Sequence, residues 1–120
     1  MAYGTYRDLI AWQKAMDLVI GVYRFSQQFP ADERFNLTSQ IRKSGVSIAS
    51  NIAEGHGRRT SKDFSHFLWI ANGSISELET QALVAERLQY TSAEATESLL
   101  VETDEVRRIA AGLRKSLNVD

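Results

Sequence analysis

The sequence predicts an all-α fold, an antiparallel up-and-down four-helix bundle that assembles as a homo-oligomer. Two observations lead to this fold. Apolar residues recur at alternating spacings of three and four along four segments, and no segment alternates between apolar and polar residues as a strand does. Short turn-forming stretches separate the four segments, which favours antiparallel neighbours. We expect one domain over residues 1–120, because a chain of 120 residues leaves no room for two.

The first helix is expected over roughly residues 7–29. Its predicted buried stripe consists of Leu9, Trp12, Met16, Val19 and Tyr23. Pro30 should end this helix, because proline has no amide donor and disfavours a helical conformation in the residue before it. The stretch from Pro30 to Glu33 is therefore predicted to be a turn.

The second helix is expected over roughly residues 34–54. Its predicted buried stripe consists of Leu37, Ile41, Ser44, Ile48 and Ile52. Gly55 should end it in the left-handed conformation that glycine adopts at little cost. Small residues between Ser44 and Ser50 lower the helix propensity but allow a neighbouring helix to approach closely.

The third and fourth helices are expected over roughly residues 61–90 and 92–117. Thr60 with Asp63 resembles a capping box at the start of the third helix, and Thr91 with Glu94 resembles one at the start of the fourth. The stripe of the third helix is Phe64, Leu68, Ala71, Ile75, Leu78, Ala82 and Ala85. The apolar residues of the fourth are Leu99, Val106, Ile109, Leu113 and Leu117.

The first and third helices each carry a second apolar stripe, and this surplus predicts self-association. The second stripe of the first helix is Ala11, Ala15, Leu18, Val22, Phe25 and Phe29. A monomer would expose a patch larger than soluble monomers usually tolerate, unless the fourth helix is broad enough to cover both outer stripes. The candidate oligomer interface is Trp69, Gly73, Ser76, Thr80, Leu83 and Phe25.

Charge is distributed unevenly along a chain whose net charge is only -1. Residues 34–62 carry six Lys and Arg side chains against Glu54 alone, whereas residues 63–105 carry nine acidic side chains against Arg87 alone. The basic stretch is either a phosphate-binding patch for nucleic acid or a solvated face that pairs between subunits. The candidate nucleic-acid-binding residues are Arg42, Lys43, Arg58, Arg59 and Lys62.

The sequence contains neither a recognisable catalytic motif nor an apolar run long enough to span a membrane. The absence of cysteine excludes disulfides, thiolate metal sites and a cysteine nucleophile. The longest uncharged run, from Phe64 to Ser76, is too short to span a membrane, and the N-terminal residues show no basic stretch followed by an apolar region of the kind found in signal sequences. We therefore expect a soluble, cytoplasmic protein that is not an enzyme and has no cofactor, no metal, no small-molecule substrate and no membrane partner.

Three smaller sets of residues leave alternatives open. Asn51 and Glu54 either present an amide and a carboxylate to a ligand, or Glu54 pairs with Arg58 or Arg42. Glu77 and Glu79 are expected to pair with arginines of the second helix, from the same or from another subunit. The remaining enzyme hypothesis is a metal site around Asp63, His66 and Glu77, although His66 is expected to be a partly buried structural residue. Trp12 and Tyr23 are expected in the core.

Several phrases of the sequence carry a resemblance to a known family. They are Trp12-Gln13-Lys14-Ala15, then Leu37 with Gln40-Ile41-Arg42-Lys43-Ser44, then residues 47–55 from Ser47 to Gly55 followed by Arg58, and finally residues 67–80 with Gly73-Ser74 and Glu77-Leu78-Glu79-Thr80. In order and spacing over roughly residues 6–90, the chain resembles the bacterial four-helix bundle protein family, also known as the 23S rRNA intervening-sequence protein family.

The resemblance implies a ring-shaped homopentamer with no established enzyme activity. It marks Gln40, Asn51, Glu54, Gly55, Glu77 and Glu79 as polar and structural positions of the family motif. Some relatives are encoded within intervening sequences of large-subunit ribosomal RNA genes. The fold also looks like that of the accessory protein of diversity-generating retroelements, a basic pentamer, from which this chain departs in its net charge of -1.

Two functions follow as hypotheses. The first is a homo-oligomeric helical scaffold that binds RNA or an RNA-associated protein, in which several copies of the basic cluster act together. The alternative is a protein-only interaction module whose basic and acidic faces satisfy one another between subunits.

Overall fold

The structure, a computed structural model, describes residues 4–119, so the ends of the expected domain, residues 1–3 and 120, lie outside the described residues. This part of the chain is all-α and holds no strand. Two short 3-10 helices, η2 (Tyr6–Asp8) and η3 (Ala31–Glu33), accompany four α-helices: α1 (Ile10–Ser26), α2 (Leu37–His56), α3 (Ser61–Arg87) and α4 (Ala93–Ser116). The prediction of an all-α fold with four helices is confirmed.

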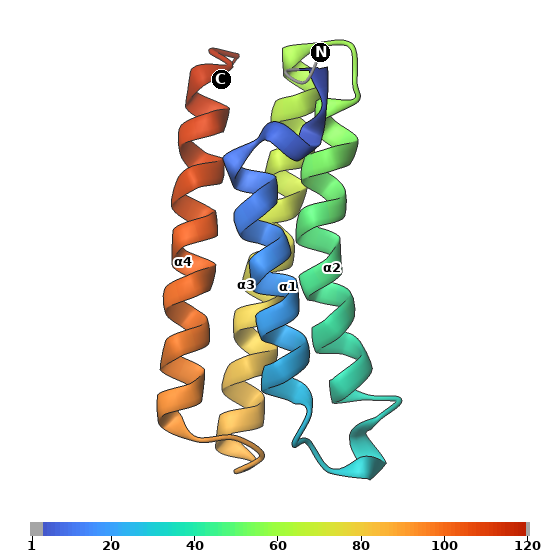
Figure 1. The fold of residues 1–120 in the computed structure, drawn as a ribbon, viewed down its shortest axis with the longest axis vertical. Coiled ribbons are helices and arrows are strands. Elements are labelled where there is room, and N and C mark those ends of the chain that lie inside the picture. Colours follow the sequence, from blue (N-terminus) through green and yellow to red (C-terminus); the bar gives the residue numbers. More distant parts are fainter. Residues whose placement is uncertain (1–3, 120) are drawn as a thin grey trace.

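The helices lie side by side in an elongated bundle of 43 × 21 × 20 Å. Each helix runs back along the one before it, and both ends of the described chain lie at the same end of the bundle as the α2–α3 connection (Figure 1). Helix α1 packs against α2 and α4, and α3 packs against the same two, so α1 and α3 are diagonal neighbours within residues 4–119. Opposite sides of the bundle are therefore formed by α1 and by α3.

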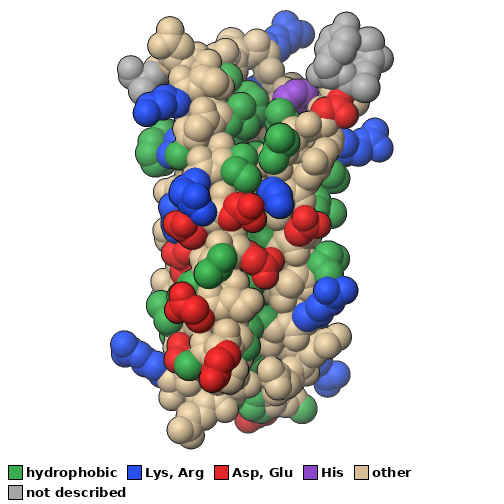
Figure 2. All heavy atoms as spheres, turned by 60° about the vertical axis from the view of Figure 1, so that its left-hand side comes forward, with side chains coloured by type: hydrophobic (Ala, Val, Ile, Leu, Met, Phe, Trp, Pro, Cys, Tyr) green, Lys and Arg blue, Asp and Glu red, His purple; other side chains and the backbone are tan. Residues whose placement is uncertain are grey.

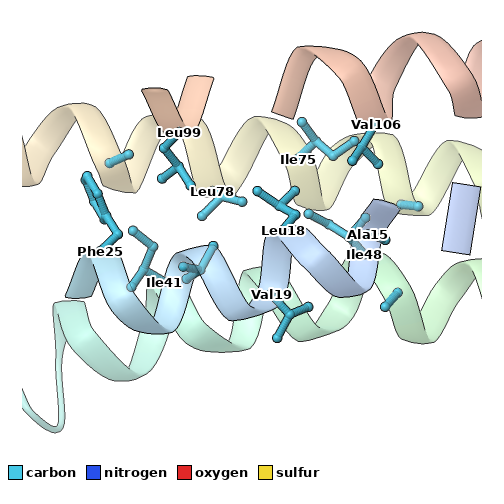
Figure 3. Close-up of a cluster of buried hydrophobic side chains, with 14 of the residues drawn as sticks. Ala15, Leu18, Val19, Phe25, Ile41, Ile48, Ile75, Leu78, Leu99 and Val106 are labelled. Carbon is cyan, nitrogen blue, oxygen red and sulfur yellow. The ribbon is translucent and has the colours of Figure 1, made fainter. Parts of the chain in front are cut away.

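The core consists of aliphatic side chains from all four helices (Figure 3). Leu18 of α1, Ile41 and Ile48 of α2, and Ile75 and Leu78 of α3 are all 0% exposed. Burying an aliphatic side chain of this size contributes about 1.5–3 kcal/mol to folding. The predicted buried stripes of the second and third helices thus form the inner faces of α2 and α3.

The inner face of α1 is not the one predicted. Its buried line is the second stripe, which includes Ala11, Ala15, Leu18, Val22 and Phe25. On the stripe expected inside, Val19 is buried, but Met16 is 38% exposed and Tyr23 is 42% exposed. Both stripes are apolar, so periodicity alone did not separate them. The alanines settle the choice because they let α1 approach its neighbours more closely than the bulky side chains of the other stripe would.

Two expected positions change with this rotation of α1. Phe25 lies in the core at 7% exposure, so its expected place in an oligomer interface is wrong. Tyr23 is exposed, so its expected place in the core is also wrong, whereas Trp12 is partly buried and packs against the core. The surplus apolar surface of α1 remains, but it lies on the other stripe.

Helix α2 packs closely on α3, its most extensive neighbour. The hydroxyl oxygens of Ser47 and Ser74 lie 2.8 Å apart across the contact. Gly55 does not end α2 in a left-handed conformation, as had been expected, because the helix continues to His56 and no glycine has a positive φ within residues 4–119. Gly55 instead lies against α3, where an added Cβ would be 2.7 Å from Cβ of Phe67. The small residues of α2 therefore permit the close approach that the sequence predicts.

The helix ends depart from the expected boundaries by a few residues. Helix α1 ends at Ser26 rather than near Phe29, and the predicted turn after Pro30 contains η3. The predicted cap of α3 is confirmed, because Oγ1 of Thr60 accepts a hydrogen bond of 3.1 Å from the amide of Asp63. The cap of α4 is Ser92 rather than Thr91.

Helix α3 stops at Arg87, three residues before the expected end at Tyr90. Gln89 adopts a left-handed conformation with a φ of 64°. The amide of Tyr90 donates to the carbonyl of Ala85, and that of Gln89 to the carbonyl of Glu86, both at 2.9 Å. These two bonds form a Schellman motif, which usually has glycine at the left-handed position. No glycine stands there to signal the stop.

Candidate nucleic-acid interface

The five predicted nucleic-acid-binding residues form two groups rather than one cluster. Arg42 and Lys43 lie in the first half of α2, whereas Arg58 and Arg59 follow α2 and Lys62 lies in the first turn of α3. At 1.5 Å per residue, the remainder of α2 separates the two groups by about 20 Å. The expectation of a single local cluster is therefore wrong, because a straight helix holds its two ends apart.

The first group lines a groove of about 540 Å³ between α1 and α2, which we call the basic groove. Most of its lining residues belong to the start of α2 and to the stretch just before it, at the end of the bundle where α1 ends and α2 begins (Figure 1). Its lining residues are Tyr23, Arg34, Phe35, Thr38, Ser39, Arg42, Lys43, Val46 and Ser47. Three of these nine are cations and none is an acid, so the groove is positively charged.

Two aromatic rings of the basic groove lie beside arginines. The guanidinium of Arg42 lies 4.6 Å from the centroid of the Tyr23 ring, and that of Arg34 lies 5.1 Å from the centroid of Phe35. Nε of Arg42 also donates a hydrogen bond of 2.8 Å to Oγ of Ser26, which fixes its position. Phe35 is 83% exposed.

Sequence reasoning did not identify Arg34 or Phe35 as candidate site residues and placed Tyr23 in the core. The available signal was the Arg34–Phe35 pair at the start of the expected second helix, outside its apolar stripe.

The second group surrounds the connection between α2 and α3. Nη2 of Arg58 lies 2.8 Å from Oε2 of Glu54, and its guanidinium lies 4.7 Å from the centroid of Phe67. The hypothesis that Glu54 pairs with Arg58 is confirmed. Arg59 and Lys62 are exposed, and neither forms an ion pair with any other residue of the described chain. These two cations are therefore available to a partner.

The polar residues of the family motif do not share one site. The amide of Asn51 donates to the carbonyl oxygen of Ser47 at 2.8 Å rather than joining Glu54 in a common pair. Gln40 and Glu77 line a groove of about 500 Å³ between α2 and α3. Glu77 forms no ion pair within residues 4–119, so its pairing with an arginine of the second helix in the same subunit is wrong, whereas pairing with another subunit stays a prediction.

Glu79 pairs with α4 rather than with the expected second helix. Its carboxylate lies 3.0 Å and 3.1 Å from the two Nη atoms of Arg107, and Oγ1 of Thr103 donates to it at 2.6 Å. Burial alone would raise the pKa of Glu79, but the hydrogen bonds from Arg107 and Thr103 outweigh it and hold this pKa below its usual value. The fork geometry makes this a bidentate pair that fastens α4 to α3.

The remaining candidate interface residues lie on the outer side of α3, where Trp69, Gly73, Ser76, Thr80 and Leu83 are all exposed. Trp69 is 50% exposed and Leu83 is 43% exposed. The guanidinium of Arg114, from α4, lies 3.8 Å from the centroid of Trp69. Helix α4 thus covers part of Trp69 but leaves Leu83 open, so the alternative in which the fourth helix covers the outer stripe is wrong.

Acidic side chains gather on the face that α1 and α4 form (Figure 2). Glu102 of α4 lies against Gly21 of α1, with its carboxylate 3.2 Å from the position of an added Cβ. Burial and the nearby charges of Asp17 and Glu105 raise the pKa of Glu102. Of the acids within residues 63–105, those of α4, such as Glu102 and Glu105, therefore lie outside the lining of the basic groove, while the others lie on α3.

The proposed metal site is not assembled. Asp63, His66 and Glu77 are exposed along α3, and no three His, Asp or Glu side chains within residues 4–119 are grouped to hold a metal ion. The expectation that His66 is partly buried is wrong. None of the described helices is long and apolar enough to cross a membrane.

Comparison with known proteins gives the family. A family model described as 23S rRNA-intervening sequence protein matches residues 7–112. The chain belongs to the 23S rRNA-intervening sequence protein family. A crystal structure of a protein with unknown function from the S23 ribosomal protein family of Bacteroides thetaiotaomicron is similar, with a TM-score of 0.78 and 25% sequence identity. The similarity covers 88% of this chain and 99% of that one. None of the curated proteins matches.

The resemblance predicted from the sequence is therefore confirmed, and it extends farther than the motifs did. Those motifs end near residue 90, whereas the match to the 23S rRNA-intervening sequence protein family reaches residue 112. The additional stretch contains Thr103 and Arg107, the two residues of α4 that hold the motif carboxylate of Glu79.

Proposed function

We propose that this member of the 23S rRNA-intervening sequence protein family is a non-enzymatic, homo-oligomeric helical scaffold that binds RNA. The resemblance to the four-helix bundle family implies that the oligomer is a pentamer. The observation that carries RNA binding is the separation of charge, with cations along α2 and the α2–α3 connection and acids on the α1–α4 face.

When exposed cations without acidic partners bind phosphates, they displace the counterions that had been condensed on the RNA, and the release of these counterions drives association. Lys43, Arg59 and Lys62 are such cations within the described chain. A single copy has a net charge of -1 and offers few of them, but several copies in one assembly repeat the group and raise the effective affinity.

Self-association is supported by two exposed apolar surfaces. The outer side of α3 carries Trp69 and Leu83, and the outer side of α1 carries Met16, Ile20 and Tyr23. Because α1 and α3 are diagonal neighbours, the two surfaces lie on opposite sides of the bundle. A contact between two different surfaces repeats from copy to copy and closes into a ring when the rotation allows.

The test of RNA binding measures the affinity for a structured RNA by fluorescence anisotropy between about 50 and about 200 mM salt. We expect a steep loss of affinity with salt. The double variant Arg59→Ala with Lys62→Ala should bind RNA more weakly. Its salt slope, the slope of log affinity against log salt concentration, should be smaller by about one unit for each lost phosphate contact. Arg58 is kept in this design because its removal would leave Glu54 without its partner.

The matched control is Lys14→Ala with Arg108→Ala. It removes two cations as well, but both are paired with acids of α4, at 3.6 Å and 2.9 Å. We expect this control to bind RNA as tightly as the original protein. If the protein does not bind RNA, or binds it with an affinity that salt does not change, the proposal is contradicted and the protein-only module is favoured. In that module RNA plays no part, and charge reversal at Glu77 or Arg42 should change the mass of the assembly.

A further inference from the structure

We propose that the basic groove is a binding site for single-stranded RNA, in which an unpaired base stacks on Phe35 while Arg34 and Lys43 contact the phosphates beside it. The inference rests on the proposed RNA binding and names the site and the form of RNA. Binding at this site differs from simple attraction between charges, because it also requires the aromatic ring of Phe35.

The exposure of Phe35 is the first observation. At 83%, it is more exposed than any other large apolar residue described in the structure. The residue precedes the first turn of α2, outside the core, and the neighbouring guanidinium of Arg34 lies 5.1 Å from the centroid of its ring. An open aromatic face beside an arginine is the arrangement on which proteins stack nucleobases without regard to sequence.

The second observation is the charge of the groove. Arg34, Arg42 and Lys43 line it with no acid among the lining residues, and none of the three forms an ion pair within residues 4–119. Arg42 is hydrogen-bonded to Ser26 and stacks on the ring of Tyr23, so it holds the Tyr23 ring in place and adds positive charge to the groove. Arg34 and Lys43 are exposed and can follow the phosphates of a flexible strand.

The third observation is the shape of the site. A volume of about 540 Å³ falls in the range that holds a ligand of nucleotide size. Thr38 and Ser39 add hydroxyl groups that can bond to a ribose or a base edge. A paired base inside a duplex has both faces covered by its neighbours, so it cannot stack on Phe35, and only the two end pairs of a blunt duplex have an open face. The groove therefore favours single-stranded over double-stranded RNA.

The test compares an unstructured oligouridine of about ten nucleotides with a blunt RNA duplex of about the same length. We expect the protein to bind the oligouridine more tightly at equal salt. Phe35→Ala should weaken oligouridine binding about 10-fold to 100-fold and leave duplex binding unchanged, because only the single strand stacks. Phe35→Trp should retain the affinity, and bound oligouridine should change the fluorescence of the added indole.

Two controls separate stacking from charge and from folding. Val101→Ala removes another exposed apolar side chain, on α4, and should change neither affinity. Arg34→Ala and Lys43→Ala should each reduce the salt slope for oligouridine by about 0.7. Removal of an exposed ring leaves the core intact, so circular dichroism should be the same for Phe35→Ala and the original protein.

The outcomes distinguish this inference from the proposed function. If Phe35→Ala binds oligouridine normally while the Arg59→Ala with Lys62→Ala variant loses RNA, the function stands and the basic groove is not its site. If neither RNA binds, both are wrong. If Phe35→Ala instead changes the mass of the assembly, a second copy of the chain occupies the groove and the inference is overturned.

Discussion

Gly55 shows how one missing side chain sets the distance between two helices. It lies inside α2, where an added Cβ would be 2.7 Å from Cβ of Phe67 and 2.9 Å from a ring carbon of Phe64. Both atoms belong to α3, and Cβ of Phe67 cannot move without its backbone. The need for glycine here is close approach rather than a left-handed conformation.

We therefore expect Gly55→Ala to lower the free energy of unfolding by about 1–3 kcal/mol, the usual cost of overpacking a contact between helices. Urea denaturation at a fixed protein concentration measures this change. The matched control is Gly112→Ala in α4, where an added Cβ meets nothing within 4 Å. The control should stabilise the protein by about 0.5–1 kcal/mol, because alanine favours a helix. Equal effects at the two positions would contradict the packing argument.

Glu102 is a residue whose charge opposes folding. Burial, with Asp17 and Glu105, raises its pKa in the folded protein. A carboxyl group with a raised folded pKa stabilises the fold most below its unfolded pKa of about 4.3, and that contribution is lost as the pH rises through the folded value. At neutral pH, the charged Glu102 is therefore unfavourable.

We expect Glu102→Gln to increase the free energy of unfolding at neutral pH by less than about 1 kcal/mol, since the group is partly exposed. The gain should shrink as the pH is lowered toward about 4, where the glutamate is also neutral. Thermal denaturation at several pH values measures the effect. Glu97→Gln, at an exposed position of the same helix, is the control. A gain that persists unchanged at low pH would show that charge is not the cause.

At the scale of the elements, the Glu79–Arg107 pair decides how α4 attaches to α3. Three charge-assisted hydrogen bonds converge on one partly buried carboxylate. They lower its pKa despite the opposing effect of burial. A group with a lowered folded pKa contributes stability above its unfolded pKa of about 4.3, and this contribution is lost as the pH falls through the folded value.

We expect Arg107→Ala to lower the free energy of unfolding at neutral pH by about 1–3 kcal/mol, because it leaves a partly buried carboxylate without its main partner. The cost should decrease in acid, once Glu79 is protonated. Arg108→Ala is the control, since its pair with Asp104 is exposed and spaced four residues apart on one helix. It should change stability by no more than about 0.5 kcal/mol. A cost for Arg107→Ala that is independent of pH would argue for lost packing alone.

The end of α3 offers a second test at this scale. Gln89 holds a left-handed conformation that is unfavourable for every residue except glycine, by about 1–2 kcal/mol. Gln89→Gly should therefore stabilise the protein by up to about 1 kcal/mol, in the same urea experiment. Gln89→Val should destabilise it, because a β-branched residue tolerates this conformation least. If the glycine variant is less stable, the side chain of Gln89 has a role beyond the turn.

For the whole molecule, the exposed apolar surface of α3 is the feature on which the proposed self-association depends. If the proposed self-association holds, Leu83→Glu should split the assembly into smaller species, because it places a charge on that surface. Leu83 serves better than Trp69 here, because a carboxylate at position 69 would meet the guanidinium of Arg114 and gain a favourable partner. Val101→Glu is the matched control, an equally drastic change at a residue that is 60% exposed on α4.

Light scattering or analytical ultracentrifugation gives the mass of each variant. An unchanged mass for Leu83→Glu would remove the outer side of α3 from the interface. If the original protein is itself a monomer at micromolar concentration, self-association and the multivalent binding of RNA fail together.

The sequence by itself determined the four helices, the cap at Thr60, the inner stripes of α2 and α3 and the family. The helices, the cap and the stripes depend on residues within about four positions of one another, so local spacing is sufficient to predict them. The family follows from the order of motifs over roughly residues 6–90. Tertiary structure alone decided which stripe of α1 faces the core, which helix Glu79 contacts, and that the basic residues form two groups. Each of these depends on the distance between segments remote in sequence, and only the packing of the bundle sets that distance. The contact between Tyr23 and Arg42 in the basic groove belongs to the same class, since Tyr23 comes from α1 and Arg42 from α2, and the two become neighbours only when these helices pack.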